Sequence, residues 1–297
     1  MIAKLCIGTA QFGLNYGIAN KTGKISRKET FAILDYAQKM GINALDTALA
    51  YGDSEELIGS YIKKYNARFD VISKFSGESY LNYDNMRGAV QRSLDDLHIK
   101  QLYGYLIHKF DDFKNNRNLW KSFVRLKKEG AVLKIGFSLY QPEELDILLD
   151  AKIPLDIVQL PFSVFDKRFE PYLRILKDQS VEIHARSVFL QGLAFMAPQD
   201  LTEYFRAAGS KLQKLHALAD RTDVSIYAFC LNHVLLNPMI DHVVIGVDGV
   251  IQFKDDCRAV ADADRVRSFE RELNELKIES EDILMPFKWP KAVQKAW

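Results

Sequence analysis

Residues 26–46 read SRKETFAILDYAQKMGINALD and predict a helix followed directly by a buried strand. Ser26 and Glu29 have the spacing of a capping box, in which the hydroxyl and the carboxylate satisfy free first-turn amides. Apolar residues then recur at helical spacing, namely Ile33, Ala37 and Met40. Gly41 suits the position just past a helix end, and residues 43–46 form a short apolar run typical of a buried parallel strand.

The same unit recurs along the whole chain. Seven further short apolar runs alternate with helical stretches, at residues 5–8, 71–74, 102–108, 133–138, 156–159, 181–185 and 242–246. Strand–helix alternation repeated eight times predicts an α/β fold, a closed (β/α)₈ or TIM barrel. We expect one domain over residues 1–297, with a long helical insertion before the last strand, a further helix after Asp264 and an irregular C-terminal tail.

An open doubly wound sheet is the alternative architecture. Its nucleotide-binding form needs G-x-G-x-x-G after the first strand, whereas residues 8–13 read GTAQFG. The turn does not match a P-loop either, because Leu14 and Asn15 stand where Lys and Ser/Thr are required.

Composition excludes several classes of protein. Lys+Arg number 40 against 39 Asp+Glu, so no basic excess indicates a nucleic-acid partner. No run approaches about 20 apolar residues and no signal-peptide pattern opens the chain, so we expect no membrane partner. The 3 cysteines fit neither a disulfide framework nor a zinc spacing, and the histidines show no ligand spacing. We therefore expect a cytoplasmic protein without a metal.

Polar residues at strand ends form the candidate catalytic set, because barrel enzymes react at the C-terminal ends of their strands. The set consists of Asp46, Tyr51, Lys74 and His108. A Tyr hydroxyl titrates near ~10, and an adjacent ammonium lowers that pKa. A carboxylate would hold the ammonium, and an imidazole would orient a substrate oxygen. Together they would protonate a carbonyl oxygen as hydride adds to its carbon, with a nicotinamide cofactor as the hydride source.

Residues 46–55, DTALAYGDSE, resemble the D-T-A-x-x-Y-G-x-S-E motif of the aldo-keto reductases. Lys74 in VISK and His108 in YLIH stand where that family has its other catalytic residues, and the likeness runs from Leu5 to about Asp256. The resemblance implies that Tyr51 is the general acid, Lys74 its pKa modulator, Asp46 the partner of Lys74 and His108 the substrate-orienting donor.

The resemblance also implies a nicotinamide site. Gln159 matches the family's carboxamide-binding Gln, and Ser138 matches the Ser of its G-x-S-N segment, although Leu139 replaces the Asn. Residues 185–187, ARS, resemble the family's A-Y-S, so that Arg186 replaces the Tyr that stacks on the nicotinamide and Ser187 follows it. Arg186 is expected to pack near the nicotinamide or to reach an anionic substrate.

At the phosphate end, residues 244–248, VIGVD, resemble the family's I-P-G-x-R. This makes Gly246 a cofactor contact and places Asp248 where a basic residue often meets the adenosine 2′-phosphate. Gln252, Asp255 and Asp256 stand where the family contacts adenine and ribose, and Lys254 is a substitute cation. NADP(H) is the family's usual cofactor and our first expectation; NAD(H) is the alternative.

Three functions remain open. The first is an NAD(P)H-dependent aldo-keto reductase acting on a small carbonyl substrate. Residues 8–20 resemble a bacterial subgroup found with sugar-modifying enzymes, which suggests a sugar-type carbonyl. The second is a Schiff-base lyase using Lys74. The third is a nicotinamide-binding, redox-sensing or regulatory barrel with little turnover, a reading kept open by Leu139, Arg186 and Asp248.

Overall fold

The eight strands close into one parallel barrel, in which each strand pairs with the next along the chain and β8 pairs with β1. The computed structural model describes residues 1–17, 23–77 and 83–290. The strands are β1 (Leu5–Gly8), β2 (Ala44–Asp46), β3 (Asp70–Phe75), β4 (Leu102–Ile107), β5 (Val132–Ser138), β6 (Ile157–Pro161), β7 (Glu182–Arg186) and β8 (His242–Gly246). The predicted barrel is confirmed, and the open-sheet alternative is wrong because β1 and β8 pair.

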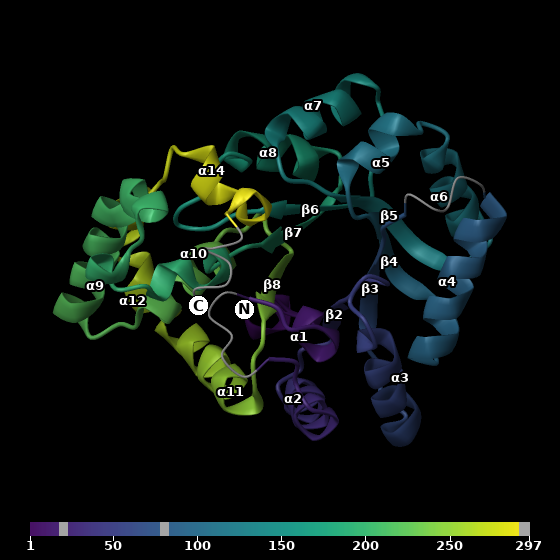
Figure 1. Cartoon of the computed structure of the whole chain (residues 1–297), viewed down its shortest axis with the longest axis horizontal. Coiled ribbons are helices and arrows are strands. Elements are labelled where there is room, and N and C mark those ends of the chain that lie inside the picture. Colours follow the sequence, from purple (N-terminus) through teal and green to yellow (C-terminus); the bar gives the residue numbers. More distant parts are fainter. Residues whose placement is uncertain (18–22, 78–82, 291–297) are drawn as a thin grey trace.

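The helices lie outside the strands, as Figure 1 shows. The α-helices are α1 (Ala10–Gly13), α2 (Arg27–Lys39), α3 (Ser54–Tyr65), α4 (Tyr83–Leu97), α5 (Phe110–Asn115), α6 (Leu119–Lys128), α7 (Pro142–Asp150), α8 (Glu170–Asp178), α9 (Gly209–Thr222), α10 (Ile226–Leu235), α11 (Val250–Ala259), α12 (Ala263–Arg267), α13 (Glu270–Asn274) and α14 (Glu281–Leu284). Short 3₁₀ helices are η1 (Ile2–Lys4), η2 (Leu190–Phe195), η3 (Pro198–Asp200), η4 (Glu203–Ala208), η5 (Val260–Asp262) and η6 (Pro286–Lys288).

Alternation along the strands divides the buried side chains into two groups, since successive residues of a barrel strand point in and out. The larger group packs between strands and helices and includes Ile183 and Ala185 of β7. The smaller group fills the middle of the barrel interior and consists of Cys6, Ala44, Ile72, Leu106 and Ile157. Among the inward positions on either side of this apolar layer are the polar residues Asp46, Lys74 and Gln159 toward the C-terminal ends of the strands and Glu182 toward the N-terminal ends.

The start of α2 is only partly as predicted. The Ser26 hydroxyl accepts a hydrogen bond from the Glu29 amide at 3.2 Å, as a helix cap should. The Glu29 carboxylate does not reach back to its own helix. It accepts a 2.7 Å hydrogen bond from the Val250 amide, at the first residue of α11. The capping-box prediction is therefore wrong for Glu29, because a partner from a distant helix competes for its carboxylate.

The C-terminal region is also more broken than expected. The single helix predicted after Asp264 is two short helices, α12 and α13, separated at Ser268 and Phe269. The break allows the Phe269 ring to pack edge-on against Phe229 of α10, with ring centroids 5.7 Å apart. Residues 18–22, part of the segment that resembles the sugar-associated subgroup, and residues 291–297 lie outside the described ranges. Within those ranges no helix has the length and apolar character needed to cross a membrane.

Candidate active site

A cavity of about 610 Å³ opens at the C-terminal ends of the strands. Ten of the predicted site residues line it: Asp46, Tyr51, His108, Ser138, Gln159, Arg186, Ser187, Gly246, Asp248 and Gln252. Lys74 and Asp256 do not line it. The structure thus brings most of the predicted catalytic and cofactor residues to one pocket, as expected for side chains at one end of a parallel barrel.

Lys74 and Asp46 form a buried ion pair beneath the cavity. The Lys74 Nζ lies 2.5 Å from Oδ1 of Asp46 and also donates to the Thr47 carbonyl at 3.0 Å. Burial lowers the pKa of Lys74, but the Asp46 carboxylate outweighs this effect and raises it above the ordinary lysine value. Lys74 therefore stays an ammonium at neutral pH.

Tyr51 lies directly above this pair. The Lys74 Nζ is 5.2 Å from the centroid of its ring, and the His108 ring packs edge-on at 6.0 Å on another side. Backbone packing fixes the loop that carries Tyr51. A Cβ at Gly13 would lie 1.6 Å from the Tyr51 carbonyl oxygen, and Gly52 adopts φ +57° against the Gly13 carbonyl. Both positions require glycine, the first for space and the second for its left-handed conformation.

The pKa of Tyr51 differs from the sequence-based expectation. Burial raises this pKa above the ordinary tyrosine value, and the lowering effect of Lys74 only partly offsets the rise. The sequence identified the effect of Lys74 but not the stronger effect of desolvation. Burial, with Lys74, Arg186 and Lys109 nearby, lowers the pKa of His108 to about 3, so its imidazole is neutral.

Gln159 and Ser138 continue the polar layer across the barrel. The Gln159 Nε2 donates a 2.7 Å hydrogen bond to Oδ2 of Asp46, and the Ser138 hydroxyl lies 3.4 Å from the Gln159 Oε1. Both side chains are buried yet border the cavity. The Asp46 carboxylate is thus fully occupied by Lys74 and Gln159.

Arg186 lies flat on an aromatic ring at the cavity wall. Its guanidinium carbon is 3.9 Å from the ring centroid of Tyr140. Its terminal nitrogens donate to the Leu139 carbonyl at 2.7 Å and the Ser187 hydroxyl at 3.1 Å. Its Nε is buried without a hydrogen-bond partner among the described residues. The guanidinium is fixed in place and retains an unused donor.

Acidic and amide groups surround the opposite end of the cavity. The Gln11 Nε2 donates to Oδ1 of Asp248 at 3.3 Å, and the Gln252 Oε1 accepts from the Asp248 amide at 2.7 Å. Gly246 also lines the cavity here, and a Cβ at this position would lie 2.7 Å from the Gln11 Nε2, so the Gln11 side chain would have to move. Lys254 points elsewhere, with its Nζ 5.5 Å from the ring centroid of Tyr36.

Asp256 turns away from the cavity. Its side chain is 1% exposed, and Oδ2 has no hydrogen-bond partner among the described residues. Burial raises its pKa to about 8, with the nearby Tyr227 opposing the rise. Asp256 is thus placed behind Tyr227, which does border the cavity.

Sequence reasoning missed several cavity residues. Gln11, Tyr140 and Tyr227 line the cavity, and only the positions of Gln11 and Tyr140, just after strands, hinted at this. The aromatic side chains of Tyr16 and Phe287 also line the cavity. Two others belong to the core instead: Phe12 is fully buried, and Trp289 packs on Phe205 with ring centroids 4.8 Å apart.

Comparison with known proteins gives consistent matches. The model of the aldo/keto reductase family matches residues 4–271. The uncharacterized oxidoreductase YqkF of Bacillus subtilis is 25% identical over 276 residues, which cover 85% of this chain and 89% of that protein. The glyoxal reductase of Bacillus subtilis is 30% identical over 162 residues, 52% of this chain and 56% of the relative.

Solved structures agree on the fold. The aldo-keto reductase AKR11C1 from Bacillus halodurans, in its holo form, matches with a TM-score of 0.70 and 19% identity, covering 92% of this chain and 91% of that one. A putative aldo-keto reductase from Pseudomonas aeruginosa matches with a TM-score of 0.66 and 20% identity, covering 88% and 90%. At this identity the likeness shows a shared barrel architecture.

Proposed function

This chain belongs to the aldo/keto reductase family, and we propose that it reduces an aldehyde or ketone to an alcohol, with Tyr51 as the proton donor. The family makes the chain an oxidoreductase of carbonyl compounds that uses a nicotinamide cofactor. One observation carries the proposal for the residues: the buried Lys74 ammonium, held by Asp46, lies beneath the Tyr51 ring at the cavity.

The cavity residues fit a nicotinamide cofactor. Ser138, Gln159 and Ser187 offer hydroxyl and amide groups in the same cavity as Tyr51, and Gly246 and Gln252 line it as well. When bound, the cofactor supplies the hydride that adds to the carbonyl carbon. In the mechanism that we propose, the neutral His108 imidazole donates a hydrogen bond to the substrate oxygen and orients it.

As negative charge develops on that oxygen, Tyr51 transfers its phenolic proton to it, which completes the alcohol. The Lys74 ammonium stabilises the resulting phenolate, and Asp46 keeps Lys74 charged and in place. The raised pKa of Tyr51 keeps its proton available at neutral pH. The phenolate then recovers a proton from solvent.

For the cofactor, we propose that NADH serves at least as well as NADPH, although NADP(H) is the family's usual partner. Asp248 and Glu29 place two carboxylates around the start of α11, where the resemblance locates the adenosine 2′-phosphate. A phosphate would be repelled there, while Lys254 lies over Tyr36 and does not compensate.

For the substrate, we propose a small carbonyl compound that carries hydroxyl or anionic groups. Aromatic side chains and Arg186 line the cavity, and polar sugars pack well between rings and charged donors. Relatives named glyoxal reductase and methylglyoxal reductase match parts of the chain, so we include small dicarbonyls. The three free, buried cysteines suit the reducing cytoplasm that we propose as its location.

Turnover tests the proposal directly. Purified protein is given NADH or NADPH with glyoxal, methylglyoxal, a keto sugar and a keto acid, and loss of nicotinamide absorbance is followed. We expect turnover of at least one of these classes of carbonyl compound. Tight cofactor binding with no turnover across the panel would favour the regulatory barrel. A covalent adduct on Lys74 after borohydride trapping would favour the lyase, although a buried ammonium is a poor nucleophile.

A further inference from the structure

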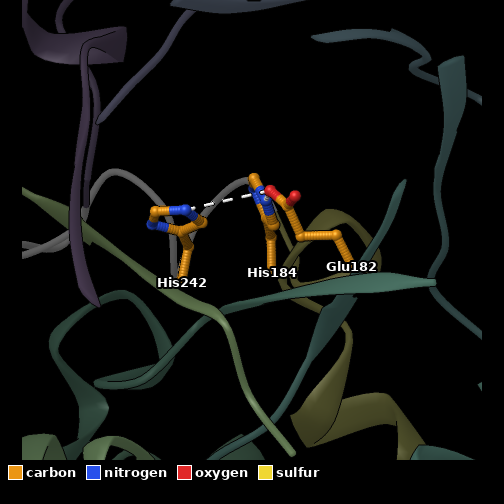
Figure 2. Close-up of side chains that lie close together, drawn as sticks. All are labelled: Glu182, His184 and His242. Atoms are coloured by element: carbon orange, nitrogen blue, oxygen red, sulfur yellow. Dashed lines mark hydrogen bonds and ion pairs between the residues drawn. The ribbon is translucent and has the colours of Figure 1, made fainter. Parts of the chain in front are cut away.

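A second polar cluster lies inside the barrel at the end opposite the cavity. Glu182 is the first and His184 the third residue of β7, and His242 is the first residue of β8. All three face inward, since they alternate with the outward-facing Ile183 and Val243. Figure 2 shows the side chains of Glu182, His184 and His242 converging. Sequence spacing predicted no metal here, because strand pairing alone brings His184 opposite His242.

From this arrangement we propose that Glu182, His184 and His242 bind one divalent transition-metal ion, with zinc as the best fit. One potential ligand atom from each residue lies within 4.8 Å of the other two. The Glu182 Oε1 is 2.6 Å from Nε2 of His184 and 3.8 Å from Nε2 of His242. Three protein ligands leave a fourth position for water in a tetrahedral site.

The spacing is compatible with a shared ion. Zinc–nitrogen and zinc–oxygen bonds of about 2.0–2.2 Å place tetrahedral ligand atoms roughly 3.3 Å apart. The two measured separations from the Glu182 oxygen lie on either side of this value. Side-chain rotation can therefore bring the three atoms onto one ion while the strands stay in place.

The carboxylate is already oriented by neighbours from two other strands. Its Oε2 accepts a 2.8 Å hydrogen bond from the Tyr103 hydroxyl of β4 and pairs with the Lys134 ammonium of β5. This leaves Oε1 directed at the imidazoles. Such outer partners commonly fix metal-binding carboxylates in place.

The donor set selects the kind of ion. Two imidazole nitrogens and one carboxylate oxygen suit zinc and its neighbours cobalt and nickel, whereas magnesium and calcium prefer oxygen ligands alone. The Lys134 ammonium, which pairs with the same carboxylate, repels any dication. This repulsion most disfavours ions that the site would bind weakly, such as magnesium and calcium.

The ion would have a bracing role. β7 and β8 share only two paired positions, fewer than any other neighbouring strands of the barrel. A metal held by His184 and His242 would join the two strands where their backbone ladder is shortest. Gly246, which lines the cavity, lies four positions after His242 in β8, about 13 Å away at the usual rise per residue. We therefore expect carbonyl reduction to be unaffected by chelators.

Metal binding can be measured on tag-free, full-length protein treated with a chelator and then titrated with Zn²⁺ against a chromophoric competitor. We expect one equivalent to bind with a micromolar or tighter Kd and to raise Tm. Replacing zinc by Co²⁺ should give the intense visible bands of a four-coordinate ion.

Two variants and one control locate the site. Glu182→Gln and His242→Gln should each weaken binding at least ~10-fold, since even outer partners of metal ligands are worth that much. His98→Asn is the control, because His98 is exposed, and Asn tolerates its φ of +53°. It should bind zinc as the unaltered protein does.

Two results would overturn the proposal. One is a wild-type protein that binds no stoichiometric zinc at micromolar concentration or gives only the pale spectrum of six-coordinate Co²⁺. The other is tight binding that survives in both variants. The cobalt spectrum needs no variant, so it decides the matter even if Glu182→Gln or His242→Gln fails to fold.

Discussion

Lys74 and Asp46 form an ion pair closed off from solvent, with side chains 1% and 5% exposed and Nζ 2.5 Å from Oδ1. Gln159 donates to the second carboxylate oxygen, so both oxygens of Asp46 already accept a hydrogen bond from a buried neighbour. In the mechanism that we propose, Asp46 acts through Lys74, and Tyr51 is the group that exchanges a proton with the bound molecule.

Replacing Tyr51 by Phe should remove the proton donor and leave the cavity shape intact. We expect kcat for carbonyl reduction to fall by roughly 10²–10⁴, the usual contribution of a positioned general acid. Nicotinamide binding, measured by fluorescence titration, should change little.

Tyr140→Phe serves as the matched control, since Tyr140 also borders the cavity but lies under Arg186. It should retain most activity. An equal loss in both variants, or a Tyr51→Phe enzyme of normal rate, would mean that another group supplies the proton.

Replacing Lys74 by Met should leave the Asp46 carboxylate buried without its counter-charge. Breaking a buried pair in this way costs about 3–5 kcal/mol of stability, to be measured by urea denaturation. Loss of the ammonium should also raise the pKa of Tyr51 further, because Lys74 lowers it, and move any alkaline limb of the pH–rate profile upward.

Lys24→Met is the comparison variant, because it breaks the exposed Lys24–Asp53 pair, whose expected value is below about 1 kcal/mol. Similar stability losses in the two variants would contradict the importance assigned to the buried pair.

Arg186 should favour substrates that carry a negative charge. Arg186→Met should raise KM for a keto acid by about 10-fold or more, as expected for loss of a hydrogen bond to a charged group. KM for a neutral ketone of similar size should change little. Arg186→Lys should rescue only part of the effect, because Lys lacks the planar group that stacks on Tyr140. Equal effects on charged and neutral substrates would show that Arg186 serves the cofactor instead.

Removing the charge of Asp248 should improve use of the phosphorylated cofactor. For Asp248→Asn we expect kcat/KM with NADPH to rise several-fold, and with NADH to stay within about 2-fold, since only the 2′-phosphate meets the altered charge. The control is Asp178→Asn, an exposed carboxylate paired with Arg174 at the end of α8, which should leave kcat/KM with both cofactors unchanged. A wild-type enzyme that strongly prefers NADPH would refute this account of the phosphate end.

Asp256 should make stability depend on pH. Its pKa is about 8 in the folded protein and 3.8 in the unfolded chain, so the folded state holds the extra proton between these values. The contribution of Asp256 to the free energy of unfolding is therefore largest below about pH 4, and it falls as the pH rises to about 8. The Tm of Asp256→Asn should be higher than that of the unaltered protein at pH 9, and the difference between the two should be smaller at pH 5. An unchanged difference across this range would show that Asp256 ionises normally.

The sequence was sufficient to predict the barrel, because each strand is a short apolar run followed by a recognisable helix. The positions of Tyr51 and Lys74 followed from the same rule, since both come at or after strand ends. Neither inference needed contacts between distant residues.

What the sequence left out depends on such contacts. Glu29 has the spacing of a local cap, but its carboxylate meets Val250 through the packing of α2 against α11. The rise in the pKa of Tyr51 comes from desolvation, which no local pattern records. His184 and His242 become neighbours only through the pairing of β7 with β8.

The contact between Gly13 and Gly52 has a practical consequence for protein engineering. Neither position has room for a side chain. A change in the loop after β1 therefore needs a matching change in the loop after β2. Attempts to enlarge the pocket for bulkier compounds should leave that rim alone. Phe195 and Phe287 also line the cavity, are 41% and 58% exposed, and are the better positions at which to shorten a side chain.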